Sequence, residues 1–309
     1  MTIRPSSVQE LSQMLATAFA AGSPAESIDL RQLTGIQEYH PEDLTVTVQT
    51  GTTLAELQSE LRKHGQWLPV DPPNPAQITI DRLLNENLSG PRRFGYGTIR
   101  EHLLGITAVL ADGRIIHNGG KVVKNVAGFD LCKLFVGSRW SLGMVVAATF
   151  KLWPQPVEER LLAAECHTPA HADELLEKLR QSPITPIVLD LYSFEGAPWT
   201  LVLGLAGTSA EVEWQSSEAA SFGFSGSSFA YEDRFWNGPT TARRASVLPS
   251  KLVSEIQRLQ PREFVSRAGN GVIYCRGGAA PASSEIPQSL NQRVKEVFDP
   301  KAILPALQS

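Results

Sequence analysis

Five glycines in the middle of the chain are the residues whose type and spacing most suggest chemistry. Gly119 and Gly120 end a strand-like run, Gly128 follows a segment of lysine, valine and asparagine, and Gly137 and Gly143 flank a short polar turn. Glycine adopts positive φ and lets the backbone approach another group closely. These positions suit a loop laid against a ligand or a loop laid against another strand, and glycines alone do not decide between the two.

Other residue types offer little catalytic chemistry. The six histidines show no HxH spacing, so we expect no metal site. Cys132 lies among apolar residues and is expected in the core rather than as a nucleophile. The chain has no G-x-S-x-G, Walker A or Rossmann G-x-G-x-x-G motif. We therefore assign no catalytic acid, base or nucleophile.

The composition is typical of an ordinary soluble globular protein. The 309 residues allow two domains, and 42% of them are hydrophobic and 19% charged. The formal net charge of −4 gives no basic excess, so we expect neither nucleic acid nor an anionic membrane surface as a partner. Three widely spaced cysteines without a CxxC pair indicate a reduced compartment. Without a signal-peptide pattern or a membrane-length apolar stretch, the expected location is the cytoplasm.

The first half of the chain alternates helices and strands. A helix is expected from Val8 to Gly22, with Ser6 or Ser7 as its N-cap, and another from Leu54 to His64, which Gly65 stops. Shorter helices are expected at Ile78–Leu88 and Leu131–Phe135. Strands are expected where residues alternate or run apolar, at Ser27–Leu30, Leu44–Gln49, Leu103–Leu110, Arg114–His117 and Met144–Trp153.

The second half has a different rhythm, and a proline-rich stretch ending at Pro156 marks the boundary. The predicted domains are residues 1–156 and 157–309. The order strand, helix, strand, strand, helix over residues 161–221 predicts a ferredoxin-like split βαβ layer with helices on one sheet face. An aromatic-rich loop over 225–239, a helix over Ser246–Gln260, a hairpin and a closing helix over Leu290–Phe298 follow. The fold class is α+β, and no internal sequence repeat is evident.

Four sequence blocks between Leu88 and Gly143 carry a family resemblance. They are Leu88-Ser89-Gly90-Pro91-Arg92-Arg93, Gly97-Thr98-Ile99-Arg100, Leu110-Ala111-Asp112-Gly113-Arg114 and the run from Gly119 to Gly143. Their ordered series resembles the FAD-linked oxidases of the vanillyl-alcohol-oxidase and p-cresol-methylhydroxylase superfamily, in particular the branch of the glycolate oxidase E subunit. The resemblance is dense over residues 30–156 and loose elsewhere.

This resemblance implies an FAD-binding domain of the p-cresol-methylhydroxylase (PCMH) type, made of two subdomains, followed by a cap domain that completes the substrate site. In that family, backbone N–H groups of glycine-rich turns hold the FAD diphosphate, because they approach an anion closely without bringing a counter-charge. The implied reaction is hydride transfer from C2 of a small 2-hydroxy acid such as glycolate to the flavin. Other glycolate-oxidase-type subunits are the implied partners.

The resemblance also carries over individual residues. The segment from Ser266 to Val272 resembles the cap strand near the flavin, and Phe298-Asp299-Pro300-Lys301 resembles the family's closing motif. The implied cofactor-binding positions are Gly90, Gly97, Thr98, Gly119, Gly120, Asn125, Gly128, Gly137, Ser138, Leu142 and Gly143.

Two departures from the family pattern weaken the predicted FAD site. The interval from Gly22 to Ile28 is too short for the strand, glycine-rich turn and strand that wrap the diphosphate in the family. Ile80-Asp81-Arg82-Leu83 replaces a Gly-Gly turn. Losing about three charge-assisted hydrogen bonds at roughly 1.5–3 kcal/mol each lowers affinity by about three to six orders of magnitude.

Charged residues near these two departures would both repel and attract an FAD diphosphate. Asp81 would repel a diphosphate that it faced, and Arg82, Arg92 or Lys121 would offset part of that repulsion. Two hypotheses follow. The chain is a glycolate-oxidase-E-type subunit whose own FAD site is weakened, as the retained block from Gly119 to Gly143 favours. Alternatively, it is a flavin-free structural or interaction subunit of the same descent, as the short interval after Gly22 favours.

Overall fold

The chain folds into two compact units in the computed structural model, which describes residues 2–25, 27–120, 130–281 and 288–306. Unit 1 comprises Met1–Ser89, Thr98–Gln155 and Ser284–Ser309, and unit 2 comprises Gly90–Gly97 and Pro156–Ser283. The chain therefore passes between the units four times. One passage lies at the proline-rich stretch before Pro156, two enclose the short segment 90–97, and the last precedes residue 284.

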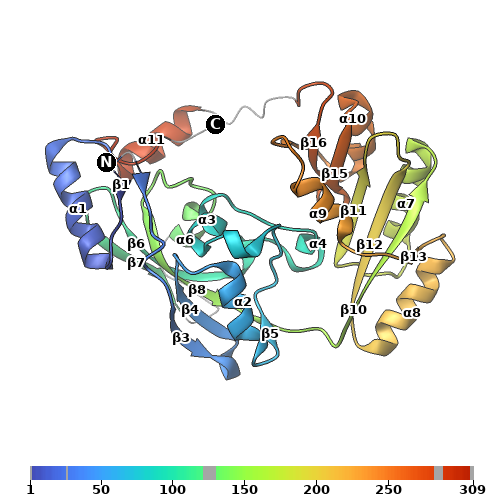
Figure 1. Cartoon of the computed structure of the whole chain (residues 1–309), viewed down its shortest axis with the longest axis horizontal. Coiled ribbons are helices and arrows are strands. Elements are labelled where there is room, and N and C mark those ends of the chain that lie inside the picture. The colour runs from blue at the N-terminus through green and yellow to red at the C-terminus, as the bar shows by residue number, and fades with distance from the viewer. Residues whose placement is uncertain (1, 26, 121–129, 282–287, 307–309) are drawn as a thin grey trace. The chain divides into compact units, whose positions relative to one another are not determined.

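Unit 1 is built on a five-stranded antiparallel sheet with the order β3-β4-β8-β6-β7 (Figure 1). Its strands are β3 (Ile36–His40), β4 (Thr45–Gln49), β8 (Met144–Lys151), β6 (Leu103–Val109) and β7 (Ile115–Gly119). Two small sheets accompany it, a parallel pair of β1 (Thr2–Ile3) with β2 (Ser27–Ile28) and an antiparallel pair of β5 (Gln66–Trp67) with β9 (Trp153–Pro154).

Helices cover both faces of this sheet. Val145 of β8 belongs to a core cluster with Leu57 of α2 (Leu54–Arg62), whereas its neighbour Val146 packs in a cluster with Leu11 of α1 (Val8–Ala21). Successive strand residues point to opposite faces. The apolar run over residues 144–148 of this strand is therefore what burial on both faces requires.

Caps set the ends of the longer helices of unit 1. Ser7 accepts a hydrogen bond from the Glu10 amide at 3.1 Å, and Gly22 closes α1 with a φ of 64°. Thr53 and Glu56 form a capping box at the start of α2. The shorter elements are the helices α3 (Ile80–Asn85), α5 (Ile99–His102), α6 (Leu131–Phe135) and α11 (Gln288–Phe298), and 3-10 turns at Pro41–Asp43 and Pro75–Gln77.

Unit 2 is a seven-stranded antiparallel sheet with the order β13-β10-β12-β11-β15-β16-β14. The strands are β10 (Glu158–Cys166), β11 (Val188–Ser193), β12 (Trp199–Gly207), β13 (Ser225–Gly226), β14 (Arg243–Ser246), β15 (Glu263–Arg267) and β16 (Val272–Arg276). The helices are α4 (Arg93–Tyr96), α7 (Pro169–Gln181), α8 (Ser209–Ala220), α9 (Ala230–Trp236) and α10 (Leu252–Leu259), preceded by a 3-10 turn at Pro249–Lys251. A further 3-10 turn, Ala268–Asn270, joins β15 to β16.

The first four strands of unit 2 confirm the predicted ferredoxin-like arrangement. In chain order β10, β11, β12 and β13 take the sheet order 4-1-3-2, with α7 and α8 as the crossover helices. A second strand–helix–strand–strand series, β14-α10-β15-β16, repeats the 1-3-2 part of this order on the other side of β11. The sheet thus contains two split βαβ motifs joined through β11 and β15, although their sequences show no evident repeat.

The segment 225–239 differs from the predicted loop, because α9 forms within it. Tyr231 and Phe235 are four residues apart, and both are buried against Val188 and Val265 on one face of the sheet. Helices α7, α8 and α10 cover the other face (Figure 1). Tertiary packing of this aromatic pair therefore forms a helix where the flanking serines and glycines predict a loop.

The helix expected over Ser246–Gln260 begins only at Leu252. The residues before it end β14, and Pro249 starts a 3-10 turn, where the missing N–H of proline is tolerated. In the part of the chain that the structure describes, no helix has both the length and the apolarity to cross a bilayer.

Candidate functional site

The predicted cofactor-binding positions are divided between the two units. Gly90 and Gly97 belong to unit 2, whereas Thr98 and the later positions belong to unit 1. Asn125 and Gly128 lie outside the described residues. The residues of the predicted site therefore belong to two separate units.

Five of the predicted amide donors already donate within the chain. Within unit 2, the Gly97 amide donates to the Arg93 carbonyl at 3.0 Å. In unit 1, the Thr98 amide donates to the Glu101 carboxylate at 2.7 Å, and the Gly120 amide to the Leu104 carbonyl at 3.2 Å. The remaining two are Gly137, which donates to Leu84 O at 2.9 Å, and Ser138, which donates to Phe135 O at 3.2 Å.

Gly119 illustrates what the glycines of this block do in the fold. It pairs with Gly105 across β6 and β7 and has a φ of +79°. A Cβ at this position would lie 2.1 Å from the Leu104 carbonyl oxygen. The close approach that requires glycine here is to a neighbouring strand, one of the two alternatives that the sequence leaves open.

Asp81 lies in a buried hydrogen-bond network that fixes the turn 137–141. Its Oδ2 accepts a hydrogen bond from Trp140 Nε1 at 2.8 Å, and its Oδ1 accepts one from Asn85 Nδ2 at 3.0 Å. Asn85 Oδ1 in turn accepts from the Trp140 amide at 2.8 Å and from Ser138 Oγ at 3.1 Å. Asp81 therefore faces donors of its own chain, which no local sequence pattern indicates.

Burial raises the pKa of the Asp81 carboxyl to about 7, and the hydrogen bonds from Trp140 and Asn85 oppose that rise. The turn that this network holds is unusual. Arg139 and Trp140 both have left-handed backbone conformations, with φ of 50° and 62°. Such conformations cost roughly 1–2 kcal/mol per residue without glycine, so the hydrogen bonds to α3 stabilise a turn that would otherwise relax.

Lys295 of α11 attaches the C-terminal segment to the same turn. Its Nζ donates to the Ser141 carbonyl at 2.9 Å and to Asp299 Oδ2 at 2.6 Å, and it also contacts the carbonyls of Leu304 and Pro305. Asp299 accepts two backbone amides as well, from Ile303 and Leu304. Lys295 and Asp299 are 6% and 2% exposed, so this is a buried, fully bonded ion pair.

The cations considered as phosphate partners are engaged elsewhere. Arg82 pairs with Glu86 on α3 at 3.0 Å. Arg92, within unit 2, pairs with Glu159 at 2.6 Å and stacks over the ring of Phe229. Lys121 lies outside the described residues. Neither arginine is therefore held ready for a diphosphate.

Unit 2 contains a buried charged cluster that sequence analysis did not assign. Arg267 of β15 stands opposite Asp190 of β11 and pairs with it at 2.5 Å. The same guanidinium binds Glu232 of α9 with both terminal nitrogens, at 2.7 and 2.8 Å. Tyr231 Oη donates to Asp190 at 2.8 Å. The sequence signal was the segment from Ser266 to Val272, which contains Arg267 but does not indicate its partners Asp190 and Glu232.

The charges of this cluster do not balance, because two carboxylates share one guanidinium. Burial raises the pKa of Asp190 to about 7, since the attraction of Arg267 only partly offsets the loss of water and Glu232 adds repulsion. Asp190 Oδ1 and Arg267 Nε are buried without a hydrogen-bond partner among the described residues. Arg267 is thus committed to binding groups of its own unit.

Comparison with known proteins finds one matching family model and solved structures with a similar fold. Residues 12–119 match the family described as FAD binding domain. The solved structure of an alkyldihydroxyacetonephosphate synthase shares the fold, with a TM-score of 0.71 over 98% of this chain and 75% of that one, at 18% sequence identity. Residues 12–119 thus resemble an FAD-binding domain, and this resemblance supports FAD as the cofactor.

Part of the chain is similar in sequence to glycolate oxidase subunits and to a D-lactate dehydrogenase. The chain is 36% identical to glycolate oxidase subunit GlcD of Bacillus subtilis over 56% of its own length and 36% of the relative's. It is 33% identical to glycolate oxidase subunit GlcE of Escherichia coli over 59% of its length and 52% of the relative's. A probable mitochondrial D-lactate dehydrogenase of Danio rerio is 40% identical over 46% and 28%. The chain is therefore related to glycolate oxidase subunits, and the matches span about half or less of each relative.

The described amides that the resemblance assigns to FAD are not free to bind its diphosphate. Five predicted amides already have acceptors, and Asp81 is buried against donors of its own chain. Each of those amides would have to exchange an existing hydrogen bond for one to the diphosphate, which gains less than filling a free donor.

Proposed function

We propose that this chain serves as a glycolate-oxidase-E-type subunit in a 2-hydroxy-acid-oxidising complex, and that its own hold on FAD is weak. The observation that carries the proposal is the turn 137–141. The family resemblance implies that Gly137 and Ser138 bind the cofactor, and here Asp81, Asn85 and Lys295 bind the same turn from within the chain. When FAD is bound, it supplies the hydride-accepting chemistry of this family.

The kinship to two kinds of glycolate oxidase subunit supports a role in a complex. A chain that holds FAD weakly gains from a partner, because contacts across an interface add to the few that its own residues offer. We infer that the substrate is a small 2-hydroxy acid such as glycolate and that the partners are other subunits of that type.

A second candidate is a flavin-free interaction subunit of the same descent. It is favoured by the hydrogen bond between Trp140 Nε1 and Asp81, which gives the buried carboxylate a protein partner instead of a ligand. The two candidates differ in one respect. Only the first requires FAD to bind at all, whether to the chain alone or to its complex.

The flavin content of the native complex separates the candidates. The purified chain alone is expected to be colourless after desalting under either candidate, because free FAD gives the same visible bands as bound FAD and is removed with the excess. Bands that persist through desalting would contradict weak binding. The complex isolated from native cells through a tag on this chain is expected to reduce a dye with glycolate. A complex without flavin and without that activity would leave the second candidate.

A further inference from the structure

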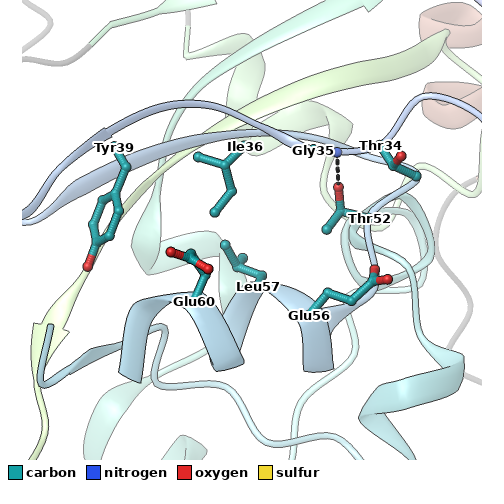
Figure 2. Close-up of a pocket in the computed structure, with 8 residues that line it drawn as sticks. All are labelled: Thr34, Gly35, Ile36, Tyr39, Thr52, Glu56, Leu57 and Glu60. Atoms are coloured by element: carbon teal, nitrogen blue, oxygen red, sulfur yellow. Dashed lines mark hydrogen bonds between the residues drawn. The ribbon is translucent and has the colours of Figure 1, made fainter. Parts of the chain in front are cut away.

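A slot between strand β3 and helix α2 of unit 1 is a cavity to which none of the predicted cofactor residues contributes. Its volume is about 520 Å³, which is within the usual range of small-molecule sites, roughly 300–1,000 Å³. Figure 2 shows its lining, with β3 on one side and α2 on the other: Thr34, Gly35, Ile36, Tyr39, Thr52, Glu56, Leu57 and Glu60.

The slot has an apolar middle and two acidic groups. Ile36 of β3 and Leu57 of α2 face each other across it (Figure 2). Glu56 and Glu60 lie one helical turn apart on α2, about 6 Å along its axis. No lysine, arginine or histidine is among the described lining residues. The lining therefore complements a cation with an aliphatic body, and it repels a phosphate.

Both carboxylates keep one oxygen available. Glu56 Oε2 accepts the amide and the hydroxyl of Thr53, at 2.9 and 2.8 Å, and Glu60 Oε2 pairs with Lys63 Nζ at 2.5 Å. Oε1 of each has no hydrogen bond within the described part of the chain. The capping bonds also lower the pKa of Glu56, so this carboxylate is charged at neutral pH.

Tyr39 forms one end of the slot. Its hydroxyl donates to Gln66 Oε1 at 3.0 Å, and its ring packs edge-on against His64 at 5.1 Å, which fixes the phenol in place. An ammonium beside Glu60 would lie near this aromatic ring, where a cation is attracted to the ring face.

We propose that the slot binds a linear aliphatic diammonium ion, an α,ω-diaminoalkane of about four carbons. Its two charged ends are then about one helical turn apart and match Glu56 and Glu60, while its methylene chain lies between Ile36 and Leu57. Lys63 acts as an internal competitor, because its ammonium already occupies one oxygen of Glu60. Lys63 is 63% exposed, so a ligand can displace it without disturbing the core.

Calorimetric titration of the full chain with 1,4-diaminobutane at low salt tests the proposal. Saturable binding is expected to be tighter than for 1-aminobutane, absent for 1,4-butanediol, and weaker as salt is added. Across diamines of two to eight carbons, affinity is expected to peak near four. Equal binding of the diol, or affinity that ignores chain length, would overturn the proposal.

Three variants locate the binding. Glu60→Gln is expected to weaken binding about threefold to fivefold, and Lys63→Met to strengthen it by a similar factor. The control is Glu86→Gln, which removes an equally charged helix carboxylate that pairs with Arg82 outside the slot, and it is expected to leave affinity unchanged. An unchanged affinity for Glu60→Gln, or an equal loss in the control, would refute the assignment. Unfolding midpoints within error of the wild type show that all three variants are folded.

Discussion

Each unit buries an aspartate whose pKa is raised to about 7, yet the two aspartates have different partners. Asp81 in unit 1 accepts hydrogen bonds from an indole and a side-chain amide, which are neutral donors. Asp190 in unit 2 shares a guanidinium with a second carboxylate. A protonated Asp81 still has acceptor capacity for its neutral donors, whereas an asparagine at this position would set its own N–H₂ group against one of them. A guanidinium that loses its partners, or carboxylates that lose the guanidinium, leave a bare buried charge.

The difference separates two kinds of buried polar group. The unit 1 network holds the turn 137–141, and its neutral donors allow Asp81 to gain or lose a proton. The unit 2 cluster joins β11, β15 and α9 and depends on the charge of Arg267, which two carboxylates share. Single substitutions should therefore act unequally in the two units.

Arg267→Met is expected to have the largest effect. It leaves Asp190 and Glu232 buried beside each other without a counter-charge, which costs about 4–5 kcal/mol of unfolding free energy. Urea unfolding monitored by circular dichroism measures the loss. The control is Arg258→Met, which removes an exposed arginine paired with Glu255 on α10 and should cost at most about 1 kcal/mol. Equal losses for the two variants would abolish the distinction between the units.

Lys295→Met comes next, at about 3–4 kcal/mol. Asp299 loses its buried cation but keeps the amides of Ile303 and Leu304, so the cost should be below that of Arg267→Met. Lys301→Met, which removes an exposed lysine bound to Phe19 O, is the control. The readout is faster limited proteolysis near the C-terminus together with a lower urea midpoint. A Lys295 variant as resistant as the wild type would show that α11 is held by its apolar face alone.

Gly95→Ala tests whether segment 90–97 packs tightly within unit 2. A Cβ there would lie 2.6 Å from Ile187 Cα within unit 2, and overpacking of this kind costs about 1–3 kcal/mol. Gly226→Ala is the control, because a Cβ at that position meets nothing within 4 Å. We expect a lower thermal midpoint for Gly95→Ala only. If both variants match the wild type, the glycine is not needed for packing in unit 2.

Asp81→Asn is expected to have the smallest effect, and one that depends on pH. The folded-state pKa of the Asp81 carboxyl, about 7, is above its ordinary value of 3.8. The folded chain therefore holds a proton that the unfolded chain has lost, and stability contributed by this group falls as pH rises from about 4 to about 7. The asparagine variant removes that slope, but its amide N–H₂ faces one of the two donors, so it should be less stable than the wild type at pH 5 by about 1 kcal/mol, with the gap narrowing at pH 8. Unfolding midpoints at pH 5 and pH 8 decide, and parallel pH profiles would contradict the raised pKa.

Local signals in the sequence predicted much of the fold. Ser7 and Gly22 mark the ends of α1, and Leu131–Phe135 forms the short helix expected there, because caps and apolar spacing act within one turn. Helix α9 was missed because serines and glycines surround it, although the i, i+4 spacing of Tyr231 and Phe235 was a usable signal.

The candidate site was less readable, because its contacts join residues far apart in the chain. Trp140 and Asp81 are 59 residues apart, Arg267 and Asp190 are 77 apart, and Lys295 and Ser141 are 154 apart. A glycine pattern predicts where a backbone can approach another group. It does not predict whether that group is a diphosphate or, as at Gly119, a neighbouring strand.

We propose that the chain's own residues hold the turn 137–141 and that the chain alone binds FAD weakly. Equilibrium titration of the desalted chain with FAD, followed by flavin fluorescence, tests it most directly. We predict no saturation at micromolar FAD for the chain alone. Stoichiometric, saturable binding in that range would contradict the account.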